Sequence, residues 1–96
     1  MGVRFEWDRK KAALNLKKHG ISFDEASTVF KDPLALIFDD EEHSEGEDRE
    51  IIVGHSILDR LILACFTERA EGLVRIIHAR QATRKERRDY EENPFR

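Results

Sequence analysis

The run REIIVGHSILDRLILACFTERAEGLVRIIHAR, residues 49–80, decides the fold. It contains three β-prone segments, residues 49–55, 60–67 and 73–80, which are separated by short connections. The connections are too short to hold crossover helices, so the three segments are predicted to pair as an antiparallel meander. The middle segment is apolar at nearly every position, which is typical of a central strand covered on both faces.

The residues at the N-terminus predict one short strand and a first helix. Residues 3–7 alternate apolar and charged side chains as a half-buried strand does, and Asp8 can cap the helix that follows. This helix is predicted over residues 9–18 and ends at Gly20. Its expected apolar stripe consists of Ala12, Ala13 and Leu16.

A second helix and a further strand are predicted before the meander. Ser22 and Glu25 have the spacing of a capping box, and the helix ends before Asp32. Its buried face is expected to contain Phe23, Ala26, Val29 and Phe30. Residues 34–38 are β-prone, and residues 39–48 are acidic without any apolar side chain. We expect that acidic run to be a loop, either a solvated connector or a surface that repels nucleic acid or meets a basic partner.

The last helix is predicted over residues 83–90, where Thr83 and Glu86 form a second capping box. The positions at which a helix ordinarily buries apolar side chains hold charges here. Core packing does not account for such a helix, and we interpret the segment from Arg75 to Tyr90 as a platform for RNA or another polyanion.

The predicted order is β-α-α-β-β-β-β-α. This is an α+β fold in which two N-terminal helices pack on an antiparallel β-sheet and a basic helix follows at the C-terminus. A chain of 96 residues is large enough for one core, so residues 1–96 are expected to form a single domain.

Charge is divided unevenly along the chain. The net charge is −3, but residues 1–20 carry +4, residues 21–58 carry −9 and residues 69–88 carry +5. Charged residues make up 39% of the chain and apolar residues 40%, which indicates a soluble globular protein with a charge-rich surface. The basic ends are the parts of the chain suited to an anionic partner.

Several classes of protein are disfavoured. Cys65, the one cysteine, lies in an apolar run and is interpreted as a core residue. The four histidines form no zinc motif, and phosphate-binding or dinucleotide-binding glycine loops are absent, so no metal or cofactor is expected. No apolar run approaches a membrane span and no signal peptide is evident, so the expected location is the cytoplasm.

Candidate residues for ribonuclease chemistry gather near the end of the meander. Cleavage without a metal needs a base for the 2′-hydroxyl, cations for the charge on phosphorus and an acid for the departing oxygen. Alternation in the last strand places His78 and Arg80 on one face, together with Val74 and Ile76. In the helix, Glu86 and Tyr90 share a face, and the cations around them are Arg84, Lys85, Arg87 and Arg88.

Structural roles are open for the same residues. His78 is equally compatible with a half-buried sheet position, Glu86 with its capping role, and the helix cations with a solvated face. For Lys18 and His19, which end the first helix, the structural alternative is capping of that helix. For Arg49, which begins the meander, it is a local ion pair.

With these residues in place, the chain resembles the BrnT family of type II toxins, within the wider RelE-like group of small ribonucleases. The resemblance covers nearly the whole chain. It rests on the order and spacing of FEWD at 5–8, KHGISF at 18–23, DP at 32–33, GHS at 54–56, FTER at 66–69, AR at 79–80 and YE at 90–91.

The resemblance implies a RelE-like fold, metal-independent RNA cleavage that inhibits translation, and neutralisation by a BrnA-type antitoxin. That antitoxin is expected to be a ribbon-helix-helix protein that forms a hetero-oligomer with the toxin and carries it to operator DNA. The family's polar motif positions correspond here to Lys18, His19, Arg49, Arg80, Glu86 and Tyr90. One departure is His78, because the family usually has serine at that position.

The leading hypothesis is therefore an endoribonuclease toxin. Arg49 and Arg80 would hold the phosphate, with His19 or His78 as base and Glu86 or Tyr90 as acid. The expected RNA-binding residues are Arg75, Arg84, Lys85, Arg87 and Arg88. The alternative hypothesis is a non-catalytic module that binds nucleic acid or protein and acts as a transcriptional corepressor with its partner.

Overall fold

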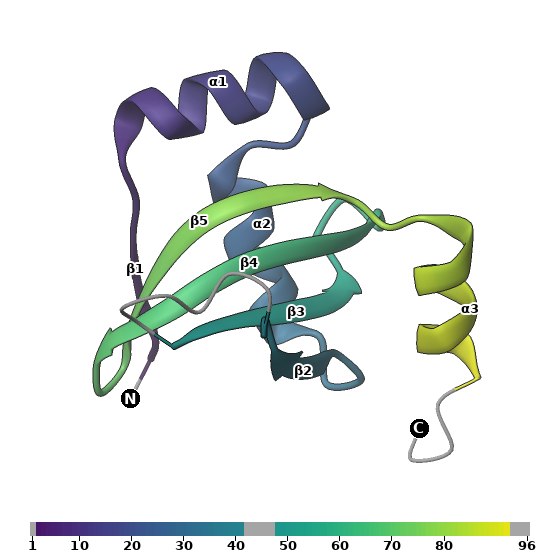
Figure 1. Cartoon of the computed structure of the whole chain (residues 1–96). Coiled ribbons are helices and arrows are strands. Elements are labelled where there is room, and N and C mark those ends of the chain that lie inside the picture. The colour runs from purple at the N-terminus through teal and green to yellow at the C-terminus, as the bar shows by residue number, and fades with distance from the viewer. Residues whose placement is uncertain (1, 42–47, 93–96) are drawn as a thin grey trace.

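The computed structural model describes residues 2–41 and 48–92, and its elements follow the predicted order (Figure 1). These residues form three helices, five strands and one short 3-10 helix, η1, which follows the second helix. In chain order they are β1 (Arg4–Glu6), α1 (Arg9–His19), α2 (Phe23–Thr28), η1 (Val29–Lys31), β2 (Leu36–Asp39), β3 (Arg49–His55), β4 (Leu61–Ala70), β5 (Leu73–Gln81) and α3 (Arg84–Glu91).

The strands form one sheet in the order β1-β5-β4-β3-β2. The meander of β3, β4 and β5 is antiparallel as predicted, and β2 pairs antiparallel with β3. β1 pairs in parallel with β5, from Arg4 beside Leu73 to Glu6 beside Arg75, so the sheet is mixed rather than wholly antiparallel. The α+β class with helices packed on the sheet is confirmed.

The main core lies between the sheet and the first two helices. α1 and α2 both pack against β5, and η1 packs against β3. In Figure 1, α1 lies above β5 and α2 lies behind the strands. The buried apolar residues of this core are Ile21, Phe23, Ala26, Val29, Ile52, Ile62, Ala64, Phe66, Val74, Ile76 and Ala79. The predicted apolar face of the second helix is confirmed by Phe23, Ala26 and Val29.

The predicted apolar stripe of α1 is only partly present, because Ala12 packs against the core whereas Ala13 is exposed. Leu16 is 51% exposed, whereas the buried residue of this helix is Asn15. The Asn15 amide accepts a hydrogen bond from the Ala79 backbone N–H (3.1 Å) and donates to the Ala79 carbonyl (2.8 Å) and the Ile21 carbonyl (3.0 Å). Beyond Arg75, no strand of the described residues pairs with β5 on its β1 side, so a side-chain amide takes the place of a neighbouring backbone. The hydrogen bonds of Asn15, together with the packing of Ala12, hold α1 against the sheet.

Only one half of the capping box at α2 forms. Ser22 accepts from the Glu25 backbone N–H as predicted, but the Glu25 carboxylate accepts from Ser56 Oγ (2.7 Å) and from the Arg60 guanidinium. Hydrogen bonding to Arg60 lowers the pKa of this buried carboxylate below its ordinary value. Glu25 thus ties the turn between β3 and β4 to α2.

A β-bulge changes which residues of β5 share a face. The pairing with β4 shifts between Cys65, opposite His78, and Phe66, opposite Ile76. Ile77 is the extra residue of the bulge. His78 and Arg80 do share a face, but it is opposite the core face that Ile76 occupies, so the predicted grouping with Val74 and Ile76 is wrong.

The other face of the sheet carries a smaller core under α3. Its buried residues are Val53, Leu61, Leu63 and Tyr90. Tyr90 is only 1% exposed, so α3 docks through one aromatic side chain although the sequence predicted no apolar contact for it. A single ring that buries a large apolar area can replace a stripe in a helix of two turns.

The predicted acidic loop is only partly open to description, because residues 42–47 lie outside the described residues. Within it, Asp40 is buried rather than solvated, and its carboxylate accepts from Cys65 Sγ at 3.2 Å. Cys65 is buried, as expected of a core residue. Among the described residues, no helix is both long and apolar enough to cross a membrane.

Candidate active site

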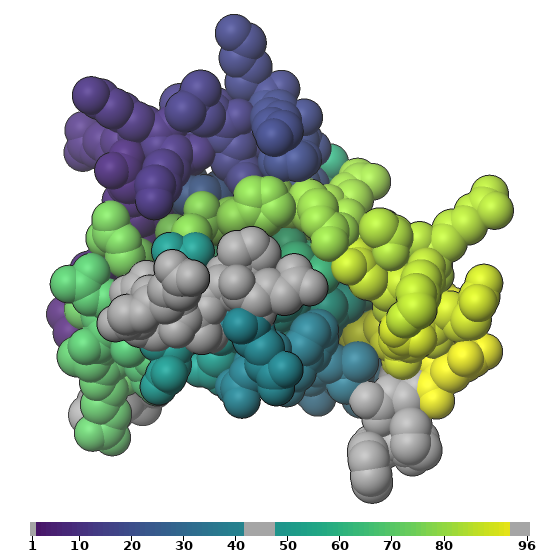
Figure 2. Space-filling model, in the orientation of Figure 1, coloured from purple at the N-terminus to yellow at the C-terminus, as the bar shows by residue number. Residues whose placement is uncertain are grey.

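A hollow of about 440 Å³ lies on the sheet face opposite α1 and α2. Its lining residues come from β2, β3, β4, β5 and α3. They are Phe38, Asp40, Arg49, Ile51, Leu63, Cys65, Ile77, His78, Arg80 and Glu86. In Figure 2, β5 is the light green surface between the purple α1 and the yellow α3. Four residues predicted from sequence as phosphate or proton-transfer groups, Arg49, His78, Arg80 and Glu86, thus meet at one hollow.

Arg80 is held in a fixed orientation by Glu86. The guanidinium donates from Nη1 to Glu86 Oε1 (2.8 Å) and from Nη2 to Glu86 Oε2 (2.9 Å), a bidentate ion pair. Glu86 Oε1 also accepts from the Thr83 backbone N–H, which completes the capping box predicted for α3. The Arg80 hydrogen bonds lower the pKa of Glu86 to about 2. Glu86 is therefore an ionised orienting group in this structure, and it has no proton to give near neutral pH.

Arg49 and Asp40 border the hollow from its β2 and β3 side. Arg49 begins β3 and lies in register with Thr67 of β4, which pairs in turn with Arg75 of β5. Burial, followed by the hydrogen bond to Asp40, raises the pKa of the Cys65 thiol to about 12. The thiol is thus a neutral donor to Asp40 and not a nucleophile.

His78 lines a second, smaller hollow of about 190 Å³ as well as the first. There its Nε2 lies 3.3 Å from Nε2 of His19, and the two rings pack edge to face with centroids 5.0 Å apart. Lys18 lines the same hollow. Asn15, one turn before His19 on α1, fixes the helix against β5 through Ala79. The two histidines predicted as alternative bases are in direct contact.

Tyr90 is not one of the residues that line the hollow. Its hydroxyl donates to Asp32 Oδ2 (2.7 Å) and lies 3.2 Å from His55 Nδ1. The same Asp32 oxygen accepts from the His55 backbone N–H at 2.8 Å. Burial alone would raise the pKa of Asp32, but these hydrogen bonds outweigh it and the pKa lies below its ordinary value. Tyr90 is thereby anchored to an ionised, largely buried carboxylate.

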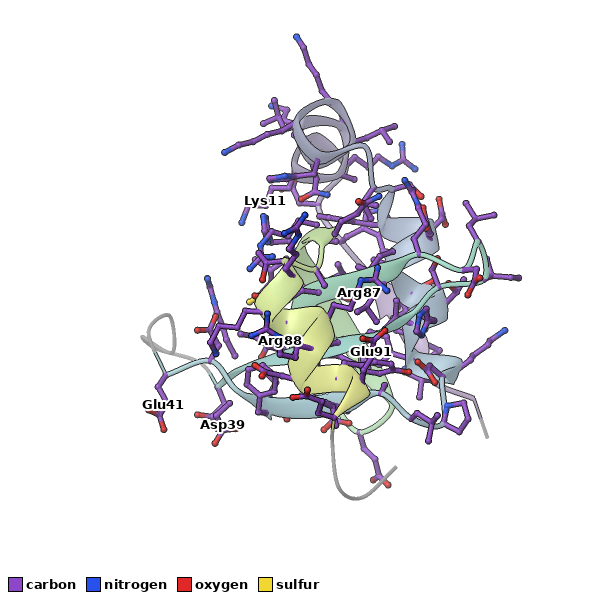
Figure 3. All side chains as sticks on the ribbon, turned by 90° about the vertical axis from the view of Figure 1, so that its right-hand side faces the viewer. Lys11, Asp39, Glu41, Arg87, Arg88 and Glu91 are labelled. Carbon is purple, nitrogen blue, oxygen red and sulfur yellow. The ribbon has the colours of Figure 1, made fainter. Side chains whose placement is uncertain are left out.

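The predicted RNA-binding residues fall into two groups. Arg84, Lys85, Arg87 and Arg88 are carried on α3, where Lys85 and Arg87 are 84% and 50% exposed. Figure 3 shows Arg87 and Arg88 on the helix surface. Lys85 pairs with Asp89 at 3.4 Å and Arg87 with Glu91 at 4.0 Å, both exposed pairs within the helix. Arg75 instead donates to Glu6 of β1 at 3.0 Å. Its charge is already satisfied inside the sheet.

Sequence reasoning missed several residues that shape the site. Asn15 and Asp32 fix α1 and Tyr90, and Asp40 and Phe38 line the hollow. Each draws its role from a partner distant in sequence, as Asn15 does from Ala79. Asn15 and Asp32 are among the residues that carry the family resemblance, but their neighbours in sequence give no sign of these partners. In the described ranges, no group of three or more histidine, cysteine, aspartate or glutamate side chains is arranged to hold a metal ion.

Comparison with known protein families identifies the chain. Residues 7–86 match the family described as the ribonuclease toxin, BrnT, of type II toxin-antitoxin systems. The chain belongs to the BrnT family. The matched residues span α1 to the first turn of α3 and include six of the seven candidate catalytic residues, all but Tyr90. A toxin of a type II system implies an antitoxin partner.

A solved BrnT structure has the same fold as this BrnT-family chain. The crystal structure of the Brucella abortus ribonuclease toxin BrnT superposes with a TM-score of 0.65 at 20% sequence identity. The likeness covers 85% of this chain and 99% of that one. At this identity the comparison establishes the fold. No curated protein is similar enough in sequence to count as a match.

Proposed function

We propose that this BrnT-family chain is an endoribonuclease toxin that cleaves RNA without a metal ion and thereby inhibits translation. The observation that carries the proposal is the meeting of Arg49, Arg80 and His78 at one hollow. When a 2′-hydroxyl attacks the adjacent phosphate, it needs a base to take its proton and cations to stabilise the negative charge. An imidazole and two guanidinium groups can supply these functions. The family's description as ribonuclease toxins supports the same chemistry.

In the proposed reaction, His78 accepts the proton of the 2′-hydroxyl. The freed oxygen attacks phosphorus, and the bond to the 5′-oxygen of the next nucleotide breaks. The products are a 2′,3′-cyclic phosphate and a 5′-hydroxyl. Arg49 and Arg80 stabilise the negative charge that develops on the phosphate oxygens. Bidentate contact with Glu86 pre-orients Arg80, so little reorganisation is needed during the reaction.

His19 is proposed to share the proton that His78 takes up. Two rings with their Nε2 atoms 3.3 Å apart keep their hydrogen bond only while one nitrogen donates and the other accepts. The pair therefore behaves as one proton-holding unit, and we propose it as the source of the proton for the departing 5′-oxygen. Glu86 and Tyr90, the acids expected from sequence, are reassigned to orientation of Arg80 and anchoring of α3.

The exposed cations of α3 are proposed to attract RNA. Arg84 and Arg88 make no ion pair with any residue in the described ranges, so their charge is available to an anionic ligand. Neutralising a residue that contacts a phosphate is expected to weaken RNA binding. It should also reduce the slope of log binding constant against log salt concentration by about 0.7 for each such residue. The rate of cleavage by bound enzyme should not change.

The proposed partner is a BrnA-type antitoxin with a ribbon-helix-helix domain, which forms a hetero-oligomer with the toxin and carries it to operator DNA. The proposed location is the cytoplasm, where translated RNA is found. Support comes from the type II assignment of the family. Co-expression with the neighbouring small reading frame tests this: growth should be restored and the two chains should co-purify.

The test of the enzymatic proposal uses the purified chain without antitoxin, incubated with RNA in EDTA, with and without ribosomes. The parent and Arg9→Ala should cleave at the same rate, because Arg9 is an exposed cation that lines neither hollow, whereas His78→Ala should cleave far more slowly. Intact RNA under both conditions would refute the enzyme. If growth arrest in cells also survives Arg80→Ala but is lost when α3 is neutralised, binding without catalysis explains the toxin.

A further inference from the structure

Phe38 occupies an unusual place for a phenylalanine in this chain. It lies on β2 and is 48% exposed at the wall of the larger hollow. Within residues 2–41 and 48–92, the other phenylalanines all pack against aromatic rings. Phe5 and Phe66 each pack against Phe30, and Phe23 packs against Trp7. Phe38 has no such aromatic neighbour there. Its ring lines a hollow instead of filling the core.

Strand pairing connects Phe38 directly to His78. Phe38 pairs with Ile51, Ile51 with Cys65, and Cys65 with His78, so the four side chains form one row across β2, β3, β4 and β5. Three strand spacings of about 4.8 Å place the two ends of the row roughly 14 Å apart. A nucleotide adjoining the one that reacts at His78 can therefore reach the Phe38 ring.

The hollow is lined by both apolar and charged side chains. Phe38, Ile51 and Leu63 form the apolar part, and Arg49 and Arg80 supply positive charge. Asp40 and Glu86 supply carboxylates that would repel a phosphate placed on the apolar part. A nucleobase carries no net charge, presents a flat apolar face to an aromatic ring, and offers N–H groups to carboxylates.

We infer that Phe38 is a nucleobase-binding residue, on which a base of single-stranded RNA stacks while the adjoining phosphate lies between Arg49 and Arg80. The inference rests on the proposed ribonuclease function, since it assigns a subsite for the RNA of that reaction. Stacking on one ring is tolerant of sequence, because every base has an aromatic face. The subsite thus favours unpaired RNA over duplex RNA, whose bases are already stacked.

The experiment measures binding of an uncleavable hexamer of 2′-O-methyladenosine to the full chain. Phe38→Leu keeps a large apolar side chain but removes the aromatic face, and it should weaken binding by about 5-fold to 150-fold. Phe38→Trp should bind the hexamer like the parent. Saturation with the hexamer should quench the indole fluorescence of this variant more than that of the parent, whose one tryptophan is Trp7. The matched control is Ile37→Ala, the neighbour that is 54% exposed on the opposite face of the same strand. Its affinity should match the parent's.

An abasic hexamer separates stacking from phosphate binding, because it should bind equally to the parent and to Phe38→Leu. Equal affinity of the parent and Phe38→Leu for the adenosine hexamer would overturn the inference. The inference would also be overturned if the indole fluorescence of Phe38→Trp stayed unquenched at saturating hexamer. This second test is independent of whether Phe38→Leu folds. Because the hexamer cannot be cleaved, an inactive toxin that still binds through Phe38 would refute the proposed function and leave this subsite standing.

Discussion

Nε2 of His78 lies 3.3 Å from Nε2 of His19, although 59 residues separate them in the chain. The contact joins the sheet to the end of α1 and places both imidazoles at the smaller hollow. It also limits the pair to one shared proton while the hydrogen bond lasts, because two N–H groups facing each other would repel. If His78 is the base, His19 is its proton-sharing partner rather than a second, independent base.

Replacement of the two histidines tests this coupling. His19→Ala and His78→Ala are each expected to slow single-turnover cleavage by about 10²-fold to 10⁴-fold. The double variant should be hardly slower than the worse single variant, since groups that act as a unit are not additive. Arg9→Ala serves as the control. A double variant whose loss equals the product of the single losses would mean that the rings act separately.

Glu86 makes stability depend on pH in a defined window. Its ordinary pKa of 4.5 falls to about 2 in the folded chain, so its contribution is complete above pH 4.5 and is lost as pH falls towards 2. We expect this contribution to be about 1–2 kcal/mol after screening by solvent. Glu86→Gln keeps a capping side chain but loses the ion pair with Arg80.

Urea unfolding of the parent and Glu86→Gln at pH 7 and at pH 2.5 measures the effect. The gap between the two free energies of unfolding should narrow at the lower pH. A gap that is independent of pH would show that the carboxylate charge is not what stabilises this helix.

Tyr90→Phe separates an anchoring role from a catalytic one. Loss of the hydroxyl removes the hydrogen bond to Asp32, which should lower the free energy of unfolding by about 1 kcal/mol. Cleavage by the folded variant should remain within a few-fold of the parent, because the hydroxyl does not line the hollow. Loss of cleavage with unchanged stability would return Tyr90 to the catalytic residues.

Asn15 is expected to control the position of His19. Asn15→Leu has similar bulk but leaves both backbone groups of Ala79 without their side-chain partner, which should cost about 3 kcal/mol of stability. Leu16→Ala on the same helix is the control, since Leu16 is 51% exposed and its loss should change stability by less than about 0.5 kcal/mol. Chemical denaturation gives both values. If Asn15→Leu and Leu16→Ala lowered the free energy of unfolding by equally small amounts, apolar contacts rather than the Asn15 hydrogen bonds would hold α1 in place.

The parts of the fold that follow local rules could be predicted from the sequence. Short connections dictated the meander, and the Thr83–Glu86 spacing gave a complete capping box. The parts that failed depend on partners distant in sequence. Glu25 leaves its cap because Arg60 offers a charged partner. α1 is held by Ala12 and by the hydrogen bonds between Asn15 and Ala79 rather than by a full apolar stripe.

The candidate site was predictable in residue type but not in arrangement. Arg49, His78 and Arg80 were identified from sequence, and they meet as expected. One extra residue at Ile77 inverted the face of β5, which strict alternation cannot anticipate. Tyr90 shares a helix face with Glu86 as predicted. Glu86 nevertheless lines the hollow, whereas Tyr90, one turn later on α3, is buried and anchors the helix.

The end groups of cleaved RNA test the central claim most directly. An oligonucleotide is incubated with the purified chain in EDTA, next to a copy with a single 2′-deoxy sugar at the cleaved position, and the fragments are identified by mass spectrometry. Attack by the 2′-oxygen with His78 as base predicts 2′,3′-cyclic phosphate and 5′-hydroxyl ends, and no cleavage at the deoxy position. Cleavage of the deoxy copy, or 5′-phosphate ends, would contradict it.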